Sequence, residues 1–322
     1  MFGFEGWTAM AVVRPLTGVA ADGHSDGVVL ADPADTHGFA IGIGVNPWYG
    51  LHDPEWMAHA VVDEAIRNVV AAGADPARVS LLDNFSWGDP RRPSTLGELA
   101  AAVRGCCDAA RMHAAPFVSG KDSLNNEYLG NDGTRHAVPP TLVITAVAHV
   151  PDAHLVVTSD LAAAGDVLVL LGRTLPEFAG SHLDAVEGAP AHAGTAPSPD
   201  AAAPERYRRL HRAMQLGLVR ACHDVSEGGL AVALAEMAIG GRLGITVHAL
   251  PVDDLPTALF SESTGRLVVE VAPDAVGELA SMIEEPLAVL GTVTEEPVLR
   301  MPGLAPIRVE ELVAAFHTEV AG

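Results

Sequence analysis

A short polar segment, VSGKDSLNNEY, concentrates groups that bind phosphate, sugar and metal. It contains the only lysine of the chain, Lys121, which lies between Gly120 and Asp122 and is followed closely by Ser123. A glycine allows close backbone approach, an ammonium group can meet a phosphate, and the oxygen-bearing side chains suit a sugar or a cation. The segment lacks the GxxxxGK[ST] spacing of a phosphate-binding loop, because the first glycine is missing and Asp122 follows the lysine. The alternative is a polar turn in which Asp122 and Ser123 cap the following segment.

A second candidate lies on a helix that we expect over residues 54–72. Glu64 and Asn68 are four residues apart, so both side chains project from one face of that helix. A carboxylate and an amide oxygen are the donors that Mg²⁺ prefers, which makes the pair a candidate metal site. The alternative is a solvated helix face on which Glu64 and Arg67 form a weak ion pair.

Polar residues also follow two apolar strands. The strand in LLDNF ends at Asp83, and ligand-binding residues often occupy such strand ends in α/β sheets. HDVSEGG places Asp224 and Ser226 before a glycine pair and an apolar helix, a turn that directs N–H groups at one point. Asp224 is therefore a candidate third oxygen ligand beside Glu64. The alternatives are an ordinary turn at Asp83 and helix capping by Asp224 or Ser226.

Hydrophobic periodicity predicts the helices and strands that must position these residues. We expect strands over 38–46, 77–85, 141–150, 166–172, 244–250 and 266–271, and a strand followed by a turn over 219–229. We expect helices over 54–72, 95–114 (with Ser94 or Thr95 as N-cap), 203–217, 230–239 and 274–285. A turn is expected at NPWYG, and the Ala-, Pro- and Gly-rich segment 187–204 is expected to be a mobile surface loop.

The length of 322 residues favours two domains, at a prior of roughly 150 residues per domain. We place them at 1–150 and 151–322, because the apolar pattern breaks around 151–165. Both blocks mix strands and helices, so the expected fold class is α/β or α+β. Hydrophobic residues make up 49% of the chain and aromatic residues only 5%, which predicts cores of Ala, Val, Leu and Ile.

The formal net charge of -22 argues against nucleic acid as a partner, because that binding draws on clustered Lys and Arg. A small phosphorylated ligand stays possible, since backbone N–H groups, helix N-termini and divalent cations hold phosphate without a basic surface. Three cysteines are too few for a disulfide framework or a zinc site. The sequence shows neither a membrane-spanning apolar run nor an export signal, so we expect a cytoplasmic protein.

Six segments occur in an order that resembles one enzyme family. They are NPWYGLHDPEWMAHAVVDEAIRNVVAAGADP, LLDNFSWGDP, PFVSGKDSLNNEY, FAGSHLDAVEG, HDVSEGGLAVALAEMA and LFSES. Together they resemble the C-terminal half of the synthetase part of phosphoribosylformylglycinamidine synthase, in the aminoimidazole ribonucleotide synthetase superfamily. The resemblance implies an ATP-binding N-terminal domain with a dimer-forming sheet, followed by an α/β C-terminal domain. It implies a ligase that uses ATP, Mg²⁺ and glutamine-derived ammonia to convert formylglycinamide ribonucleotide to the amidine.

The resemblance also implies roles for the residues of the polar segment. Asp83 and Gly120 match positions that contact ATP, and Ser123 matches one that contacts the ribonucleotide. In part of the family the residue after the glycine is an asparagine that binds Mg²⁺. Here that residue is Lys121, which is expected to meet a phosphate instead.

A second set matches an auxiliary site of the family. Glu64, Asn68 and Asp224 resemble residues that hold Mg²⁺, and Ser226 resembles a residue at an auxiliary nucleotide. Gly44 is the nearest aligned position for a further metal-binding aspartate, so the resemblance implies an incomplete set of metal ligands.

The chain contains no counterpart of the first synthetase half, which carries the catalytic histidine, or of the glutaminase. The leading hypothesis is therefore a half-enzyme that needs a partner carrying the first half and a glutaminase subunit. A second hypothesis is a homodimeric ATP-dependent enzyme of the same superfamily, and a third is a non-catalytic nucleotide-binding scaffold.

Overall fold

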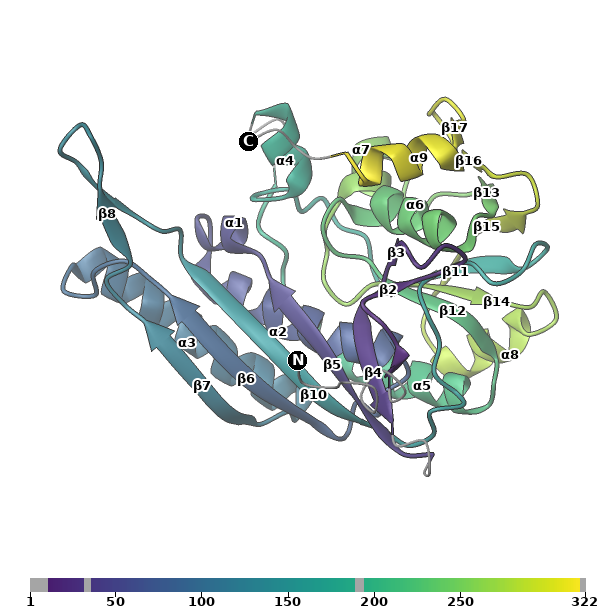
Figure 1. Ribbon diagram of the computed structural model, residues 1–322, viewed down its shortest axis with the longest axis horizontal. Coiled ribbons are helices and arrows are strands. Elements are labelled where there is room, and N and C mark those ends of the chain that lie inside the picture. Colours follow the sequence, from purple (N-terminus) through teal and green to yellow (C-terminus); the bar gives the residue numbers. More distant parts are fainter. Residues whose placement is uncertain (1–10, 32–35, 189–193, 319–322) are drawn as a thin grey trace, which may run out of the picture.

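The computed structural model describes residues 11–31, 36–188 and 194–318, which form two β-sheets with their helices (Figure 1). The chain is therefore of the mixed α/β class that the sequence predicts. Within these residues, no helix combines the length and apolar character needed to cross a membrane.

The first sheet has six strands in the order β1-β4-β5-β10-β6-β7. Neighbouring strands are antiparallel except for β6 and β7, which run parallel at one edge. Helices α2 (Pro54–Ala71) and α3 (Pro93–His113) cover one face and lie behind the sheet in Figure 1. The strands are β1 (Ala11–Val13), β4 (Gly27–Ala31), β5 (Gly38–Val45), β6 (Val79–Ser86), β7 (Phe117–Ser123) and β10 (Thr141–Val150).

Strand β5 turns its small residues toward the helices and its large ones away from them. Gly42 and Gly44 face α2, where a β-carbon at Gly44 would overlap the Val61 carbonyl oxygen. The alternate residues include Phe39 and Ile43, whose side chains are 41% and 51% exposed on the opposite face. Because α2 packs so closely on β5, the bulky apolar side chains of this strand gather on the face that carries no helix.

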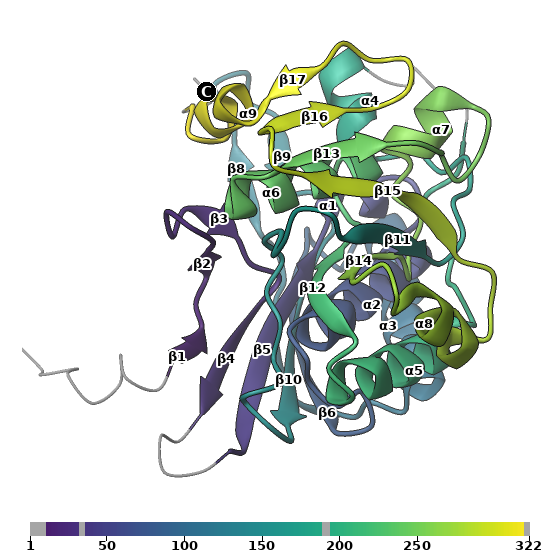
Figure 2. The same cartoon turned by 90° about the vertical axis from the view of Figure 1, so that its right-hand side faces the viewer.

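The second sheet has seven strands in the order β12-β14-β11-β15-β13-β16-β17, seen together in Figure 2. One of its faces joins the core of the first domain through α5 and α8, and the other packs on α6 and α9. The strands are β11 (Val167–Leu171), β12 (Val219–Asp224), β13 (Gly244–Val247), β14 (Leu267–Val271), β15 (Ala288–Thr294), β16 (Val298–Arg300) and β17 (Ile307–Arg308). The helices are α5 (Ala203–Gln215), α6 (Gly229–Gly241), α7 (Leu255–Phe260), α8 (Val276–Ile283) and α9 (Val309–Phe316).

The remaining elements are short. They are α1 (Pro47–Gly50), α4 (His182–Glu187), the pair β2 (Leu16–Thr17) and β3 (Gly23–His24), and the hairpin β8 (Glu127–Leu129) and β9 (Arg135–Ala137).

Most of the expected elements are confirmed, and four local predictions are wrong. The segment expected as a turn around Lys121 is part of strand β7, and NPWYG contains the short helix α1. Helix α3 begins at Pro93, a residue suited to the first helical position, and no side chain caps it. Helix α6 has Gly228 as its N-cap, so neither Asp224 nor Ser226 caps it. The surface loop expected over 187–204 lies partly outside the described residues.

Glu270 on β14 supplies a prediction about the pH dependence of stability. Its side chain is fully buried, and the Ala162 and Ala163 N–H groups donate to its carboxylate. These hydrogen bonds lower the pKa of Glu270, but burial and the nearby Asp166 outweigh them and raise it from 4.5 to about 7. Between those pH values the folded state holds a proton that the unfolded state has lost, so stability falls as pH rises. We expect Glu270→Gln to remove this fall, which is at most about 1.4 kcal/mol per pH unit.

Urea unfolding of both proteins at several pH values between about 5 and 8 measures this slope. Glu278→Gln, on the exposed side of α8, is the matched control and is expected to keep the wild-type slope. Equal slopes for wild type and Glu270→Gln would contradict the prediction.

Candidate functional site

Four predicted residues lie on the parallel strands β6 and β7, and we call Asp83, Gly120, Lys121 and Ser123 the strand-end cluster. Asp83 is paired in register with Gly120, and Ser86 is paired with Ser123. A β-carbon at Gly120 would overlap the carboxylate oxygens of Asp83. A side chain at position 120 would therefore force the Asp83 carboxylate to move, so the two positions are coupled.

The cluster presents groups on both faces of the sheet edge. Asp83 lies two residues from the buried Leu81 and two from the buried Phe85, so it shares their face of the strand, the helix side of the sheet. Lys121 is exposed on the opposite side, where its Nζ donates to Ser123 Oγ at 2.6 Å. An ammonium and a hydroxyl on one face, and a carboxylate on the other, can contact different parts of one bound ligand that wraps the edge.

Asp83 is the member of this cluster with a shifted pKa. Partial burial raises the pKa of its carboxyl, and the charge of Asp122, two residues beyond Gly120, adds to the shift. A nearby cation or a hydrogen-bond donor would favour the ionised form of this carboxyl and reverse the shift.

The other predicted residues lie where α2 meets the end of β12, and we call Glu64, Asn68, Asp224 and Ser226 the inter-domain cluster. The Glu64 carboxylate accepts from the Val45 N–H at 3.1 Å. Burial raises the pKa of Glu64 well above its usual value, and the charges of Glu227 and Asp224 add to the effect. Several carboxylates thus share a small volume with too few cations, an arrangement that favours a bound cation or a retained proton.

Asn68 and Asp224 are buried members of this cluster. Asn68 Nδ2 donates to the Ile43 carbonyl at 2.8 Å, while its Oδ1 is buried without a hydrogen-bond partner among the described residues. Asp224 Oδ2 accepts from Nε and Nη2 of Arg67, at 3.2 and 3.0 Å. Arg67 therefore forms its ion pairs with Asp63 and Asp224, and not with Glu64 as the alternative for this helix face expected.

Asp26 joins the cluster without having been predicted. It lies just before β4, and its Oδ2 accepts from the Asp224 N–H at 3.1 Å. Its Oδ1 lies 2.6 Å from His223 Nδ1, and Asp26, His223 and Asp224 present one ligand atom each within 4.8 Å of one another. Gly44 packs against α2, where a β-carbon would overlap the Val61 carbonyl oxygen, so the present backbone leaves no room for a side chain there. The only signal in the sequence is a polar Ser-Asp-Gly turn before an apolar strand.

His223 is buried between acidic partners. Burial alone would lower its pKa, but the ion pair with Asp26 and the contact of its Nε2 with Glu236 at 3.0 Å raise the pKa well above 6.5. The imidazolium therefore offsets part of the negative charge of the inter-domain cluster.

Ser226 lies in the turn between β12 and α6. Gly228 and Gly229 have φ angles of +75° and +67°, which only glycine adopts readily, and the Gly228 N–H donates to Glu262. Ser226 is half-buried, and its carbonyl accepts from the Gly229 N–H. The turn thus places Ser226 beside Asp224 at the start of a helix.

The two clusters are separate sites. Glu64 packs on β5, whereas Asp83 and Gly120 lie on β6 and β7, with β10 between β5 and β6. Neighbouring strands are about 4.8 Å apart, so β5 and β7 are separated by about 15 Å. One small ligand therefore does not contact both clusters through this sheet.

Comparison with known protein families places both domains in one family. Residues 11–150 match the model of the AIR synthase related protein, N-terminal domain. Residues 163–302 match the model of the AIR synthase related protein, C-terminal domain.

Individual relatives extend this result. The chain is 36% identical over 277 residues to the phosphoribosylformylglycinamidine synthase subunit PurL of Chelativorans sp. (strain BNC1). The aligned region covers 82% of this chain and 35% of that protein. The structure of T. maritima PurL complexed with FGAR has a TM-score of 0.73 at 21% identity, over 94% of this chain and 50% of that one. A chain of the HypE–HypF complex has a TM-score of 0.65 at 15% identity, over 88% of this chain and 92% of that one. The chain thus spans about a third of its curated relative but nearly the whole of a shorter structural neighbour.

Proposed function

Because the chain belongs to the AIR synthase-related protein family, we propose that it is one half of an ATP-dependent synthetase of purine biosynthesis. We divide it at residue 150 into an ATP-binding domain, 1–150, and a second domain, 151–322. The whole enzyme would convert formylglycinamide ribonucleotide, ATP and ammonia to the amidine, ADP and phosphate. Its curated relative is named as a subunit of that synthase, and a solved PurL holds FGAR, which supports this substrate.

One observation carries the proposal: Asp83 and Gly120 are paired in register at the exposed end of two parallel strands. We assign ATP to this strand-end cluster, with Lys121 meeting a phosphate and Ser123 contacting the ribonucleotide. A T. maritima PurL has been solved in complex with ATP, which supports nucleotide binding in this fold. In the reaction, the substrate amide oxygen would attack the γ-phosphate, ammonia would add to the amide carbon, and phosphate would leave with that oxygen.

We assign Mg²⁺ and an auxiliary nucleotide to the inter-domain cluster. Its donors are oxygen atoms, and one of them, Asn68 Oδ1, is buried without a hydrogen-bond partner among the described residues, which fits a hard cation. Glu64, Asn68 and Asp224 would hold the ion, with Asp26 as a further ligand. When bound, Mg²⁺ would neutralise phosphate charge beside Ser226. Arg67 already occupies one oxygen of Asp224, so the ion would have to use the other.

The apolar face of the first sheet supports a missing half as the main partner. Large side chains of β5 point away from both helices, and Val143 and Val147 of β10 extend the same face by register. An apolar sheet face of this kind is normally covered by another chain. We propose that the other synthetase half covers it, and that a glutaminase subunit delivers the ammonia.

We also propose a cytoplasmic location. All three cysteines are free thiols, as expected for a reducing compartment.

Reconstitution tests the activity. A chain carrying the first synthetase half is added, and ADP release is measured with formylglycinamide ribonucleotide, ATP, Mg²⁺ and ammonium chloride. We expect turnover only when both chains and all substrates are present. An inert mixture of stably associated halves would favour the scaffold hypothesis, as would unchanged turnover after Asp83→Ala.

A homodimer is the alternative, in which a second copy of this chain covers the exposed apolar side chains of β5. Native mass spectrometry of the purified chain distinguishes the two. A dimer carrying nucleotide would support a self-sufficient enzyme, in which a second copy replaces the missing half by two-fold symmetry. An empty monomer would support the half-enzyme.

Ile43→Asp tests the proposed interface. A buried, unpaired carboxylate at the centre of an apolar interface is expected to weaken association at least about 100-fold. Ile43 is exposed in the single chain, so its stability should change by less than about 0.5 kcal/mol. Analytical ultracentrifugation measures the association, and Leu129→Asp on the β8–β9 hairpin is the control. Equal weakening by both variants would argue that another surface forms the interface.

A further inference from the structure

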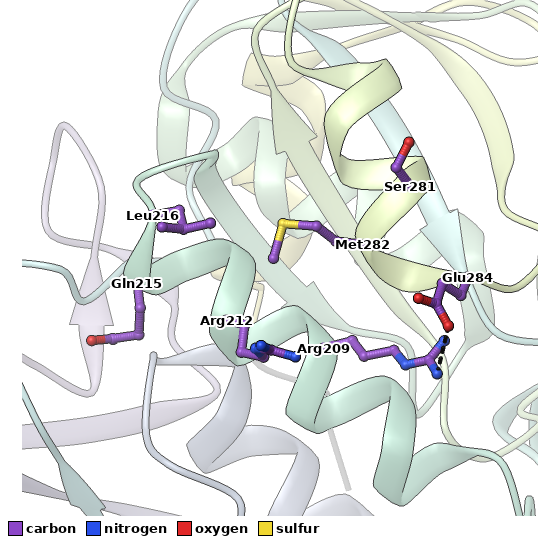
Figure 3. A pocket seen from close by; sticks show the side chains of 7 residues that line it. All are labelled: Arg209, Arg212, Gln215, Leu216, Ser281, Met282 and Glu284. Carbon is purple, nitrogen blue, oxygen red and sulfur yellow. Dashed lines mark ion pairs between the residues drawn. The ribbon is translucent and has the colours of Figure 1, made fainter.

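A cavity of about 510 Å³ opens between α5 and α8 on the second domain (Figure 3). Its volume falls within the range of about 300–1,000 Å³ that is typical of small-molecule sites. Helices α5 and α8 contribute none of the residues that we assign to ATP, ribonucleotide or metal. The cavity is therefore independent of the proposed function.

Positive charge is concentrated on one wall of this cavity. Helix α5 carries four arginines and one glutamate in 13 residues, in a chain with a net charge of -22. Arg206 pairs with Asp200 and Glu285. In so acidic a chain, we expect each arginine of α5 to have a carboxylate partner.

Two further arginines of α5 are also neutralised. Arg208 and Arg209 share Glu205. Arg209 additionally pairs with Glu284 at 3.0 Å and donates to the Ile283 carbonyl at 2.7 Å, which joins α5 to the end of α8. Figure 3 shows the Arg209 side chain extended toward Glu284 along this wall.

Arg212 is different, because it forms no ion pair with any residue in the described parts of the chain. Its exposed guanidinium lines the cavity. Gln215, three residues further along the same helix, also lines it, and the Gln215 Nε2 is buried without a hydrogen-bond partner in the described structure. Because this Nε2 is shielded from the cavity and the Gln215 amide points away from Arg212 in Figure 3, the unpaired Arg212 is the donor available to a ligand.

The cavity also has an apolar part. The side chain of Leu216 is 65% exposed, and Met282 on α8 is half-buried. In Figure 3 these two side chains point toward each other across the space beside Arg212. An exposed leucine facing a polarizable thioether offers a contact for an aliphatic or aromatic group.

We propose that this cavity binds a small organic anion. A carboxylate or phosphate of the ligand accepts hydrogen bonds from Arg212, and its apolar group packs between Leu216 and Met282. Charge-assisted hydrogen bonds to a guanidinium are among the stronger polar contacts, and Arg212 has no ion-pair partner among the described residues to compete for it.

Calorimetric titration of the full chain with phenyl phosphate and with benzoate tests the proposal. We expect saturable binding of at least one probe with a Kd below about 5 mM, and the better probe identifies the anionic group. Arg212→Ala is expected to weaken binding at least about tenfold, which is the loss of one charge-assisted contact. Arg208→Ala removes an exposed arginine of the same helix that pairs with Glu205 outside the cavity lining, and should leave binding within about twofold.

A separate variant, Met282→Ala, tests the apolar contact. Met282→Ala should weaken phenyl phosphate several-fold but leave the weaker binding of inorganic phosphate unchanged. Absence of saturable binding to the wild-type chain would overturn the proposal. Equal weakening by Arg212→Ala and Arg208→Ala would also overturn it, because that result shows general attraction to α5 and no defined site.

Discussion

Replacing Arg67 by methionine is expected to lower the free energy of unfolding by about 3–5 kcal/mol, the usual cost of breaking a buried ion pair. The Arg67 side chain is 3% exposed and bonds Asp63 on its own helix and Asp224 at the end of β12. Methionine fills a similar volume but leaves both carboxylates without their main cation. The loss is therefore electrostatic, with little contribution from a cavity.

The two carboxylates are not equally dependent on Arg67. Asp63 also accepts from the Tyr207 hydroxyl at 2.6 Å and from the Gly265 N–H at 2.9 Å. Among the described residues, the other cationic neighbour of Asp224 is His223, at 3.7 Å, and His223 is already paired with Asp26. Asp224 should therefore account for most of the loss, and adding Asp224→Asn to the Arg67→Met variant should restore part of the stability.

Urea unfolding of the variant and the wild type measures the deficit. Arg104→Met is the matched control, because Arg104 pairs with Glu55 at an exposed position, 61% and 37% accessible, where such pairs contribute less than about 1 kcal/mol. A deficit for Arg67→Met that is as small as that of the control would show that Asp63 and Asp224 do not depend on this cation.

The Arg67 network also explains which parts of the structure the sequence could predict. Helix α2 was predictable because its apolar positions recur at helical spacing, and β10 because apolar residues, several of them β-branched, make up most of it. Arg67 could not be predicted as buried, since an arginine on a helix is most often at the surface. Its burial depends on Asp224, which is 157 residues away in the sequence.

Strand β7 was missed for a related reason. It lies at the edge of the sheet, and its residues from Val118 to Asp122 are all exposed, so no alternation of apolar and polar residues marks it as a strand. Asp26 was missed because its partner Asp224 is 198 residues away. In both cases the pairing that forms the site is long-range, and local periodicity contains no information about it.

In the strand-end cluster, Gly120→Ala is expected to lower the affinity for the nucleotide by about 10- to 100-fold. The added methyl group would overlap the Asp83 carboxylate, so that carboxylate must rotate away from its present position. If Asp83 and the Gly120 backbone together contact ATP, the substitution removes one contact and blocks the approach of the other.

Gly97→Ala is the matched control for the same chemical change. Gly97 lies on the exposed side of α3, and a β-carbon there meets no atom within 4 Å. Alanine should stabilise that helix by about 0.5–1 kcal/mol and leave nucleotide binding unchanged. The pair therefore separates an effect at the strand-end cluster from a general effect of replacing glycine.

Calorimetric titration with a non-hydrolysable ATP analogue and Mg²⁺ measures the affinity, using the chain in whichever assembly native mass spectrometry identifies. Asp83→Asn provides a second variant without steric overlap, and its loss should be smaller than that of Gly120→Ala because only the charge is removed. Wild-type affinity in both variants would mean that ATP binds elsewhere, and the inter-domain cluster would then be the remaining candidate for the catalytic nucleotide. Loss in both, with Gly97→Ala unaffected, would assign the nucleotide to the paired ends of β6 and β7.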